Sequence, residues 1–237
     1  LIILTTPPVF RPLHFKAAVE AGKHVFIEKP VAVDPVGVRD IINTSKLAEA
    51  KGLTVVAGTQ MRRARHIMAG IEQIREGAMG EILSGQSTRI GGALSNWRQS
   101  EAIRSKSWSD MEWQLRRWLF TTWGSGDFIV EQHVHNLDLV DWVMGSHPVK
   151  AIGTGGRQNR TDSIYPNVWD HVSVEYEYAN GARVTHIGSQ IDGVSSRNDM
   201  RIDGTEGRLF LSFAKVTIEG KKPFKYNGPR PNPAVQE

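Results

Sequence analysis

The sequence has 237 residues, of which 40% are hydrophobic and 23% are charged, a composition typical of a globular protein with one large or two smaller domains. Disordered, collagen-like and coiled-coil chains are excluded, and the apolar runs of a few residues are far shorter than the about 18 residues of a membrane span. The net charge is only +4 and the basic residues are scattered, so we expect neither nucleic acid nor a membrane as a partner. The lack of cysteine excludes disulfides and thiolate zinc sites.

The first 60 residues show the alternation of strands and helices that is typical of parallel βαβ units. Short continuous apolar runs predict buried parallel strands, and Asp34 followed by Pro35 predicts a helix start. The predicted strands are Leu1–Leu4, Val25–Ile27 and Leu53–Ala57, and the predicted helices run from about Val9 to Ala21 and from Pro35 to about Lys51. Since residue 1 already lies in a strand-like run, we expect the sequence to begin partway through a domain.

After about Arg65 the pattern changes to one helix followed by many strands. Asn180-Gly181 between two alternating runs predicts a β-hairpin, and a long helix is expected from about Asp127 to Met144. Other strands are expected near Ile82–Ile90, Val149–Gly153, Met200–Ile202, Arg208–Leu211 and Lys215–Glu219, before a tail loop from Lys221 to Pro233. The predicted α/β fold is a partial Rossmann unit in residues 1–62, followed by an α+β domain with a large, mostly antiparallel open sheet in residues 63–237.

A dinucleotide-binding domain carries Gly-x-Gly-x-x-Gly between its first strand and helix, where the glycines let the pyrophosphate approach the helix N-terminus. This sequence has no such pattern. The nearest approximation, Gly153-Thr154-Gly155-Gly156, lies in the second predicted domain. The absence of this pattern either argues against a nucleotide domain or means that its phosphate-binding segment lies outside these 237 residues, and a sequence that begins in a strand-like run favours the second explanation.

Several motifs occur together at consistent spacing. Thr6-Pro7 is followed by Ala21-Gly22-Lys23-His24 and then by Glu28-Lys29-Pro30. Gly58-Thr59-Gln60-x-Arg62 and the stretch from Gly126 to Asp138 complete the series. Together they resemble the Gfo/Idh/MocA family of oxidoreductases over nearly the whole chain. Glu131 stands where the family has Asp, and His133 stands where Gly is usual, so the resemblance does not specify the substrate.

The resemblance implies NAD or NADP as cofactor, with Lys29 as a catalytic or substrate-orienting residue beside the nicotinamide. It also implies that Glu28 lines the cofactor site, that Thr6 and Pro7 border it with His14 as a further candidate, and that the Lys29-Pro30 bond is often cis. From the residues alone, Lys29 follows a predicted parallel strand, at the edge where such sheets bind ligands. A lysine there can polarise or deprotonate a hydroxyl, although a solvated surface lysine is the alternative.

Glu131 and His135 are four residues apart, so on a helix they share a face and can form a carboxylate–imidazole pair. The resemblance implies that this pair moves the substrate proton together with Lys29, with a buried structural histidine as the alternative. His133 and His135 point in different directions on a helix, and with Asp138 they form no complete ligand set, so no metal site is predicted.

Five of the seven tryptophans lie between residues 97 and 123, together with four arginines. Aromatic faces suit the C–H surfaces of sugars, and we expect this stretch to form a substrate wall unless its tryptophans simply pack a loop onto the sheet. The tryptophans are Trp97, Trp108, Trp113, Trp118 and Trp123, and the arginines are Arg98, Arg104, Arg116 and Arg117. The candidate substrate-binding residues are Gln60, Arg62, Trp123 and His133.

The function predicted on these grounds is NAD(P)-dependent oxidation or reduction of a secondary alcohol on a sugar, cyclitol or related polyol. One alternative is a glycoside hydrolase that uses transient oxidation, and another is a non-catalytic sugar or nucleotide sensor on the same fold. A homo-oligomer is expected for the intact protein. The compartment stays open, because any targeting segment would precede this sequence.

Overall fold

The computed structural model describes residues 1–92, 104–162 and 165–229, which group into two compact units. The first unit contains residues 1–59, 104–134, 157–162 and 165–169. The second unit contains residues 60–92, 135–156 and 170–229. The domain boundary at residue 62 stays a prediction.

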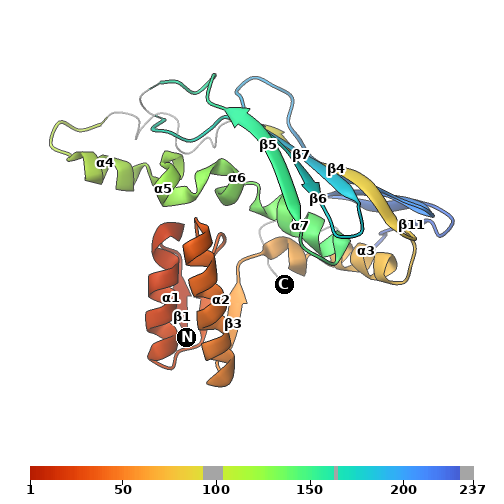
Figure 1. Ribbon diagram of the computed structural model, residues 1–237, viewed down its shortest axis with the longest axis horizontal. Helices are drawn as coiled ribbons and strands as arrows, with labels where there is room; N and C mark the ends of the chain where they lie inside the picture. Colours follow the sequence, from red (N-terminus) through yellow and green to blue (C-terminus); the bar gives the residue numbers. More distant parts are fainter. Residues whose placement is uncertain (93–103, 163–164, 230–237) are drawn as a thin grey trace. The chain divides into compact units, whose positions relative to one another are not determined.

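A three-stranded parallel sheet forms the centre of the N-terminal part of the first unit, as the sequence predicts (Figure 1). Its strands β1 (Ile2–Leu4), β2 (Val25–Ile27) and β3 (Val55–Ala57) follow one another in the order β1-β2-β3. The connections hold η1 (Pro8–Phe10), α1 (Arg11–Glu20) and α2 (Pro35–Ala50). Two successive right-handed βαβ crossovers therefore place α1 and α2 on the same face of the sheet.

Local signals explain where these helices begin and end. The Asp34 side chain accepts a hydrogen bond of 2.7 Å from the backbone N–H of Gly37 and so caps α2. Gly22 and Gly52 follow the two helices with φ of 69° and 66°, the left-handed region that favours glycine. The strand β1 is less buried than its apolar run predicts, since Ile3 is 62% exposed. The reason is that both helices lie on one face of the sheet, where the unit has its core of Phe15, Val19, Val25, Ile27 and Ala48.

The rest of the first unit consists of short helices. They are α4 (Asp110–Arg116), η4 (Trp118–Phe120), α5 (Thr122–Ser125) and α6 (Asp127–Glu131). Leu119, Phe120 and Val168 form a small core beneath them. Asp127, at the start of α6, has a φ of 68° and is the one non-glycine residue with positive φ in the part of the chain that the structure describes. Its carboxylate accepts hydrogen bonds from the backbone N–H groups of Phe128 and Trp169, which stabilises this conformation.

The prediction of one continuous helix from Asp127 to Met144 is wrong, because the structure has two helices there, α6 and α7 (Val134–Met144). The break has a clear cause in the backbone hydrogen bonds. The N–H groups of Gln132 and His133 both donate to the carbonyl oxygen of Phe128, at 2.8 and 3.1 Å. Because two donors converge on one acceptor, the regular i to i−4 ladder stops and the chain turns before α7 begins.

The second unit is an eight-stranded sheet with the order β11-β10-β9-β8-β4-β7-β6-β5. All neighbouring pairs are antiparallel except β4 and β7, so the predicted large, mostly antiparallel sheet is confirmed. Its strands are β4 (Ile82–Gly91), β5 (Lys150–Gly156), β6 (His171–Glu177), β7 (Arg183–Gln190), β8 (Arg197–Gly204), β9 (Gly207–Ser212), β10 (Val216–Gly220) and β11 (Phe224–Lys225). The predicted hairpin is β6–β7, where Gly181 has a φ of 83°.

Two helices cover one face of this sheet. The chain enters the unit through η2 (Gln60–Arg63) and α3 (Arg65–Arg75). Apolar side chains of α3 and α7 pack against Val184, Met200, Ile202 and Leu209 to form the main core. Gln86, Arg201 and Phe210 lie opposite one another on neighbouring strands, and because Arg201 alternates with the core residues Met200 and Ile202, these side chains are on the opposite face.

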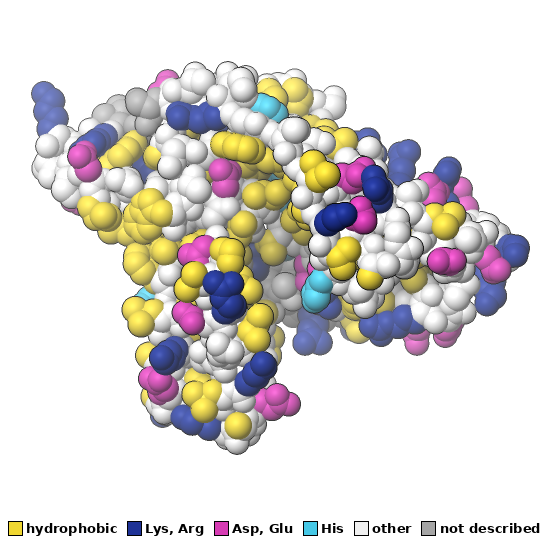
Figure 2. All heavy atoms as spheres, viewed as in Figure 1, with side chains coloured by type: hydrophobic (Ala, Val, Ile, Leu, Met, Phe, Trp, Pro, Cys, Tyr) yellow, Lys and Arg dark blue, Asp and Glu magenta, His cyan; other side chains and the backbone are white. Residues whose placement is uncertain are grey.

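The surface of α1 and α2 mixes apolar and charged side chains. Figure 2 shows hydrophobic side chains scattered among basic and acidic ones over these helices. The exposed apolar residues there are Leu13, Val36, Val38, Ile42 and Leu47. Such scattered exposure is normal for a protein surface. Among the described residues, no helix combines the length and the apolar character that crossing a membrane requires.

Candidate active site

The carboxyl edge of the parallel sheet brings together three of the predicted motifs. Thr6 follows β1, Glu28 follows β2 and Gly58 follows β3. The strand ladder continues into this edge, because Glu28 N–H donates to Leu4 at 3.0 Å and Gly58 N–H donates to Ile27 at 2.8 Å. Ligands of open parallel sheets bind at this edge.

Gly58 leaves the space that the Glu28 side chain occupies. A Cβ atom at residue 58 would lie 2.6 Å from Glu28 Oε2 and 3.2 Å from Glu28 Cα, both closer than a carbon atom tolerates without movement. The same carboxylate oxygen accepts a hydrogen bond of 3.3 Å from the backbone N–H of Lys29. The glycine of the Gly58-Thr59-Gln60 motif therefore serves the packing of Glu28 against β3.

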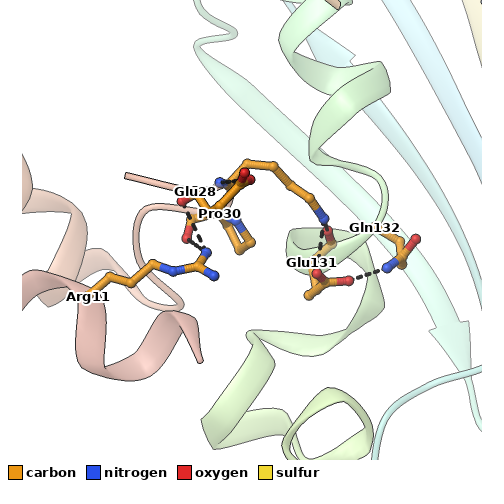
Figure 3. A network of polar contacts seen from close by, with 6 residues as sticks. Arg11, Glu28, Pro30, Glu131 and Gln132 are labelled. Carbon is orange, nitrogen blue, oxygen red and sulfur yellow. Dashed lines mark hydrogen bonds and ion pairs between the residues drawn. The ribbon is translucent and has the colours of Figure 1, made fainter. Parts of the chain in front are cut away.

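Lys29 reaches from this edge to α6. Its Nζ donates to the backbone carbonyl of Glu131 at 2.7 Å and to Oε1 of the same residue at 2.9 Å, and the two side chains are only 17% and 8% exposed. Gln132 donates to Oε2, the other carboxylate oxygen (Figure 3). The ion pair therefore joins two predicted catalytic residues that are 102 positions apart.

Arg11 and Gln132 belong to this network, and both were missed in the sequence. Arg11 Nη1 donates to the carbonyl oxygens of Glu28 at 3.0 Å and of Pro30 at 2.6 Å. The Lys29-Pro30 peptide bond is cis, as the resemblance implies. The sequence did contain a signal for Arg11. The first turn of a helix favours acidic residues, so a cation at the first position of α1 is unusual and indicates a specific role.

Two predicted cofactor-site residues lie next to each other. Thr6 Oγ1 is 3.1 Å from His14 Nδ1, and the ring of Phe10 stacks on that of His14 with centroids 6.1 Å apart. Pro7 directly precedes η1 and has φ and ψ of −49° and 141°. Thr6, Pro7 and His14 thus form a connected group after β1.

The argument that Glu131 and His135 share one helix face is wrong, because the helix breaks between them. Both oxygens of the Glu131 carboxylate are hydrogen-bonded inside the first unit, to Lys29 and Gln132. His135 belongs to the second unit, near the start of α7. A proton-handling role for His135 stays a prediction. His133 is buried in the first unit, with its ring edge-to-face on Phe128 at a centroid distance of 4.6 Å.

Gln60 and Arg62 lie in η2 of the second unit. Arg62 Nε donates to both carboxylate oxygens of Asp138, at 3.0 and 2.9 Å. The guanidinium carbon also lies 5.1 Å from the ring centroid of Trp142, within the range of a cation–π contact. Asp138, which ends the family-like stretch, therefore fixes the orientation of a predicted substrate-binding arginine.

The described tryptophans of the predicted substrate wall interleave with arginines. Trp108 stacks on Trp113 at 6.4 Å, and the guanidinium of Arg116 lies 4.5 Å from the Trp108 ring. Arg117 lies 5.6 Å from the ring of Trp113. These contacts support the alternative in which the rings hold the segment together.

Trp123 differs from these rings, since it is 37% exposed and its Nε1 donates to Gln114 Oε1 at 2.7 Å. It therefore stays a candidate for substrate contact. Trp97 and Arg98 lie outside the described residues.

The second unit has a polar interior around Asn136, the residue after His135. Asn136 Nδ2 donates to the Thr88 carbonyl at 3.3 Å and to Asn198 Oδ1 at 2.9 Å. His186, nearby on β7, is 3.1 Å from Ser87 Oγ, and burial together with the cation of Arg89 lowers the pKa of His186 to about 4. In the described residues no three His, Asp or Glu side chains are arranged to hold a metal ion.

Polar groups suited to the nicotinamide end of a dinucleotide, the Glu28 carboxylate and the Thr6 hydroxyl, lie at this edge, and Gly58 leaves room for the Glu28 side chain. The backbone pattern that holds a pyrophosphate, Gly-x-Gly-x-x-Gly, is absent from the sequence.

Family models match both parts of the chain. Residues 1–59 match the oxidoreductase family with an NAD-binding Rossmann fold, and residues 71–210 match the GFO/IDH/MocA C-terminal domain. The second match alone covers more than half of the chain. The chain therefore belongs to the Gfo/Idh/MocA family of NAD-binding oxidoreductases, which confirms the resemblance found in its motifs.

Individual relatives are distant. The chain is 27% identical over 216 residues to the 2,7-anhydro-N-acetylneuraminate hydratase of Escherichia coli, covering 91% of the chain and 52% of the relative. It is 24% identical over 195 residues to a glycosyl hydrolase family 109 protein of Shewanella amazonensis, covering 81% and 40%. The fold is similar to that of an inositol dehydrogenase homolog from Azotobacter vinelandii in complex with NAD+, with a TM-score of 0.72, 19% identity and coverage of 97% and 55%. The chain spans about half the length of the curated relatives it matches.

Proposed function

We propose that the protein is an NAD(P)-dependent oxidoreductase that acts on a secondary alcohol of a sugar, cyclitol or related polyol. The observation that carries this proposal is the Lys29–Glu131 ion pair, which extends from the carboxyl edge of the parallel sheet. In this proposal, a lysine held in this way handles the proton of a substrate hydroxyl beside the nicotinamide.

When bound, the nicotinamide would supply or accept the hydride, and in this proposal the residues of this chain handle the proton. A lysine ammonium has three N–H donors. In the part of the chain that the structure describes, Glu131 accepts two of them, so the third is directed to the substrate oxygen in this proposal. In reduction, the Lys29 ammonium donates this proton to the carbonyl oxygen as the hydride reaches the carbon, and the neutral amine regains a proton from solvent. In oxidation, the neutral amine accepts the hydroxyl proton as the hydride leaves, and the Glu131 carboxylate stabilises the ammonium that forms. Acid–base assistance of this kind typically contributes about 10²–10⁴-fold.

Other predicted residues take supporting roles in this proposal. Thr6, Pro7, His14 and Glu28 line the cofactor side, because they follow the strands whose carboxyl ends form the edge. Arg62, Gln60, Trp123 and His133 contact the substrate, and His135 assists the proton transfer. His135→Ala should then alter the pH dependence of turnover. A lower melting temperature with unchanged turnover per folded molecule would instead indicate a structural histidine.

Redox-assisted cleavage of a glycosidic bond is the second candidate, and the hydratase and glycosyl hydrolase among the relatives favour it. The cofactor balance separates the two candidates. A dehydrogenase gives stoichiometric NADH from its substrate, whereas redox-assisted cleavage releases free sugar without net NADH. A non-catalytic sensor is disfavoured, because it has no need of a partly buried lysine–carboxylate pair at this edge.

The homo-oligomer also stays a prediction, and its candidate surface is the face of the second unit's sheet opposite α3 and α7. On this face the cationic groups of Arg201 and Lys215 lie 5.8 and 5.4 Å from the ring centroid of Phe210. Sedimentation of the full-length protein tests the expectation. A Phe210→Asp variant should shift the protein toward the monomer.

The proposed function is tested with the full-length protein and a panel of sugars, cyclitols and glycosides. NADH formation and sugar release are measured for the wild type and for Lys29→Ala. We expect turnover of at least one substrate in the wild type and its loss in the variant. Equal turnover by both proteins would contradict the role of Lys29 and leave the sensor or another site to be considered.

A further inference from the structure

Arg11 is a buried cation at a position where a cation is costly. It is the first residue of α1, and it is only 4% exposed. The N-terminus of a helix disfavours positive charge, and burial lowers the pKa of the Arg11 guanidinium by penalising its charged form. Its Nε is buried without a hydrogen-bond partner among the described residues. A residue that violates local preferences in this way needs a reason elsewhere in the structure.

That reason lies in the residues on either side of Lys29. Arg11 Nη1 donates to the carbonyl oxygen of Glu28, immediately before Lys29, and to that of Pro30, immediately after it. Figure 3 shows the guanidinium directed at these carbonyls, while Glu131 lies with Gln132 on the other side of the network. The carboxylates of Glu28 and Glu131 oppose the effect of burial on the pKa of Arg11. The charge of Arg11 is therefore stabilised by Glu28, in the segment that it holds, and by Glu131, the partner of Lys29.

We propose that Arg11 is the positioning residue for Lys29, an inference that rests on the proposed function of Lys29. A lysine side chain has many rotamers, so the position of Nζ depends on both of its ends being fixed. Glu131 fixes the far end, through hydrogen bonds of 2.7 and 2.9 Å to Nζ. Arg11 fixes the near end, by holding the backbone from which the side chain extends. A planar guanidinium suits this task better than an ammonium, because its donors keep a rigid geometry.

Lys51 offers a matched control in the same unit. Its Nζ donates to the carbonyl oxygens of Val19 and Glu20, at 3.1 and 3.3 Å, near the end of α1. Lys51→Met thus removes two cation–carbonyl hydrogen bonds of the same kind without touching the residues beside Lys29. Any general effect of losing such contacts will appear in this variant as well.

The first measurement does not depend on activity. The full-length protein and its Arg11→Met, Arg11→Lys and Lys51→Met variants are treated with trace acetic anhydride, and acetylation of each lysine is quantified by mass spectrometry. We expect Lys29 to react several-fold faster in Arg11→Met than in the wild type, with Lys16 as the internal standard. Arg11→Lys should lie between the two. If Arg11→Met does not fold, the comparison of Arg11→Lys with the wild type decides the result.

The second measurement is steady-state kinetics on the same proteins. Displacement of a catalytic group by about 1 Å can cost on the order of 10²-fold, so kcat should fall by about that factor in Arg11→Met, with partial recovery in Arg11→Lys and little change in Lys51→Met. Unchanged acetylation of Lys29 in the folded Arg11 variants, or equal effects in Lys51→Met, would overturn the proposal. If Lys29→Ala has normal turnover, the proposed function fails, while the acetylation result still decides whether Arg11 positions Lys29.

Discussion

Replacing Glu131 by Gln tests whether the Lys29–Glu131 contact is an energetically coupled ion pair. Gln preserves the size of the side chain and removes its charge, and the Glu131 carbonyl can still accept from Lys29 at 2.7 Å. Breaking a fully buried pair costs about 3–5 kcal/mol and breaking an exposed pair about 0–1 kcal/mol. With side chains that are 17% and 8% exposed, the pair lies between these limits. We expect a loss of about 2–3 kcal/mol in the free energy of unfolding.

A double-mutant cycle isolates this interaction from the other effects of each substitution. Urea-induced unfolding of the full-length protein is measured for the wild type, Lys29→Met, Glu131→Gln and the double variant. We expect a coupling energy of about 1–3 kcal/mol. The exposed pair Lys16–Glu20, at 4.0 Å and with side chains 62% and 56% exposed, is the matched control and should show a coupling below about 0.5 kcal/mol. Additive effects of Lys29→Met and Glu131→Gln would refute the reasoning.

Three further predictions follow from the geometry. The pKa of His186 is about 4 in the folded protein and 6.5 in the unfolded chain. As the pH falls from 6.5 to 4, only the unfolded state binds this proton, so the free energy of unfolding should decrease by about 3 kcal/mol. His186→Gln should flatten this part of the stability profile, and parallel profiles for the two proteins would contradict the assignment. Gly58→Ala should lower turnover and cofactor affinity by displacing Glu28. Gly91→Ala is the control, because its new Cβ would meet only Ser196 Oγ, at 3.5 Å, and it should have little effect on either quantity. Similar losses in both variants would argue against the special role of Gly58. The 237 residues by themselves should bind NAD weakly in calorimetry, since they lack the Gly-x-Gly-x-x-Gly backbone, and micromolar one-to-one binding would show that the cofactor site lies elsewhere.

Elements with local signals could be predicted from the sequence. The strand β2 is a continuous apolar run, the Asp34 side chain caps the N-terminus of α2, and Asn180-Gly181 determines the turn of the β6–β7 hairpin. Each signal acts within a few residues, so it can be read without knowledge of the tertiary structure. The motif at Glu28-Lys29-Pro30 was found in the same way, because its residues are contiguous.

Long-range partners could not be predicted in this way. The sequence places Glu131 four residues before His135 and so suggests that the two are paired, but the turn after α6 removes the shared helix face. The cationic partner that the structure shows for Glu131 is Lys29, 102 residues away. The contact of Arg11 with the carbonyls beside Lys29 likewise depends on how α1 packs against the end of β2. A pattern with a helical period carries no information about such contacts.

The kinetics and cofactor affinity of Lys29→Ala in the full-length protein test the central claim most directly. Lys29 is proposed to act on the substrate proton, so kcat should fall by about 10²–10⁴-fold. The dissociation constant of NADH, measured by fluorescence titration, should change far less than kcat. A variant that keeps wild-type kcat, or one whose activity loss is fully explained by weaker NADH binding, would contradict the assignment of Lys29 as the proton-handling residue.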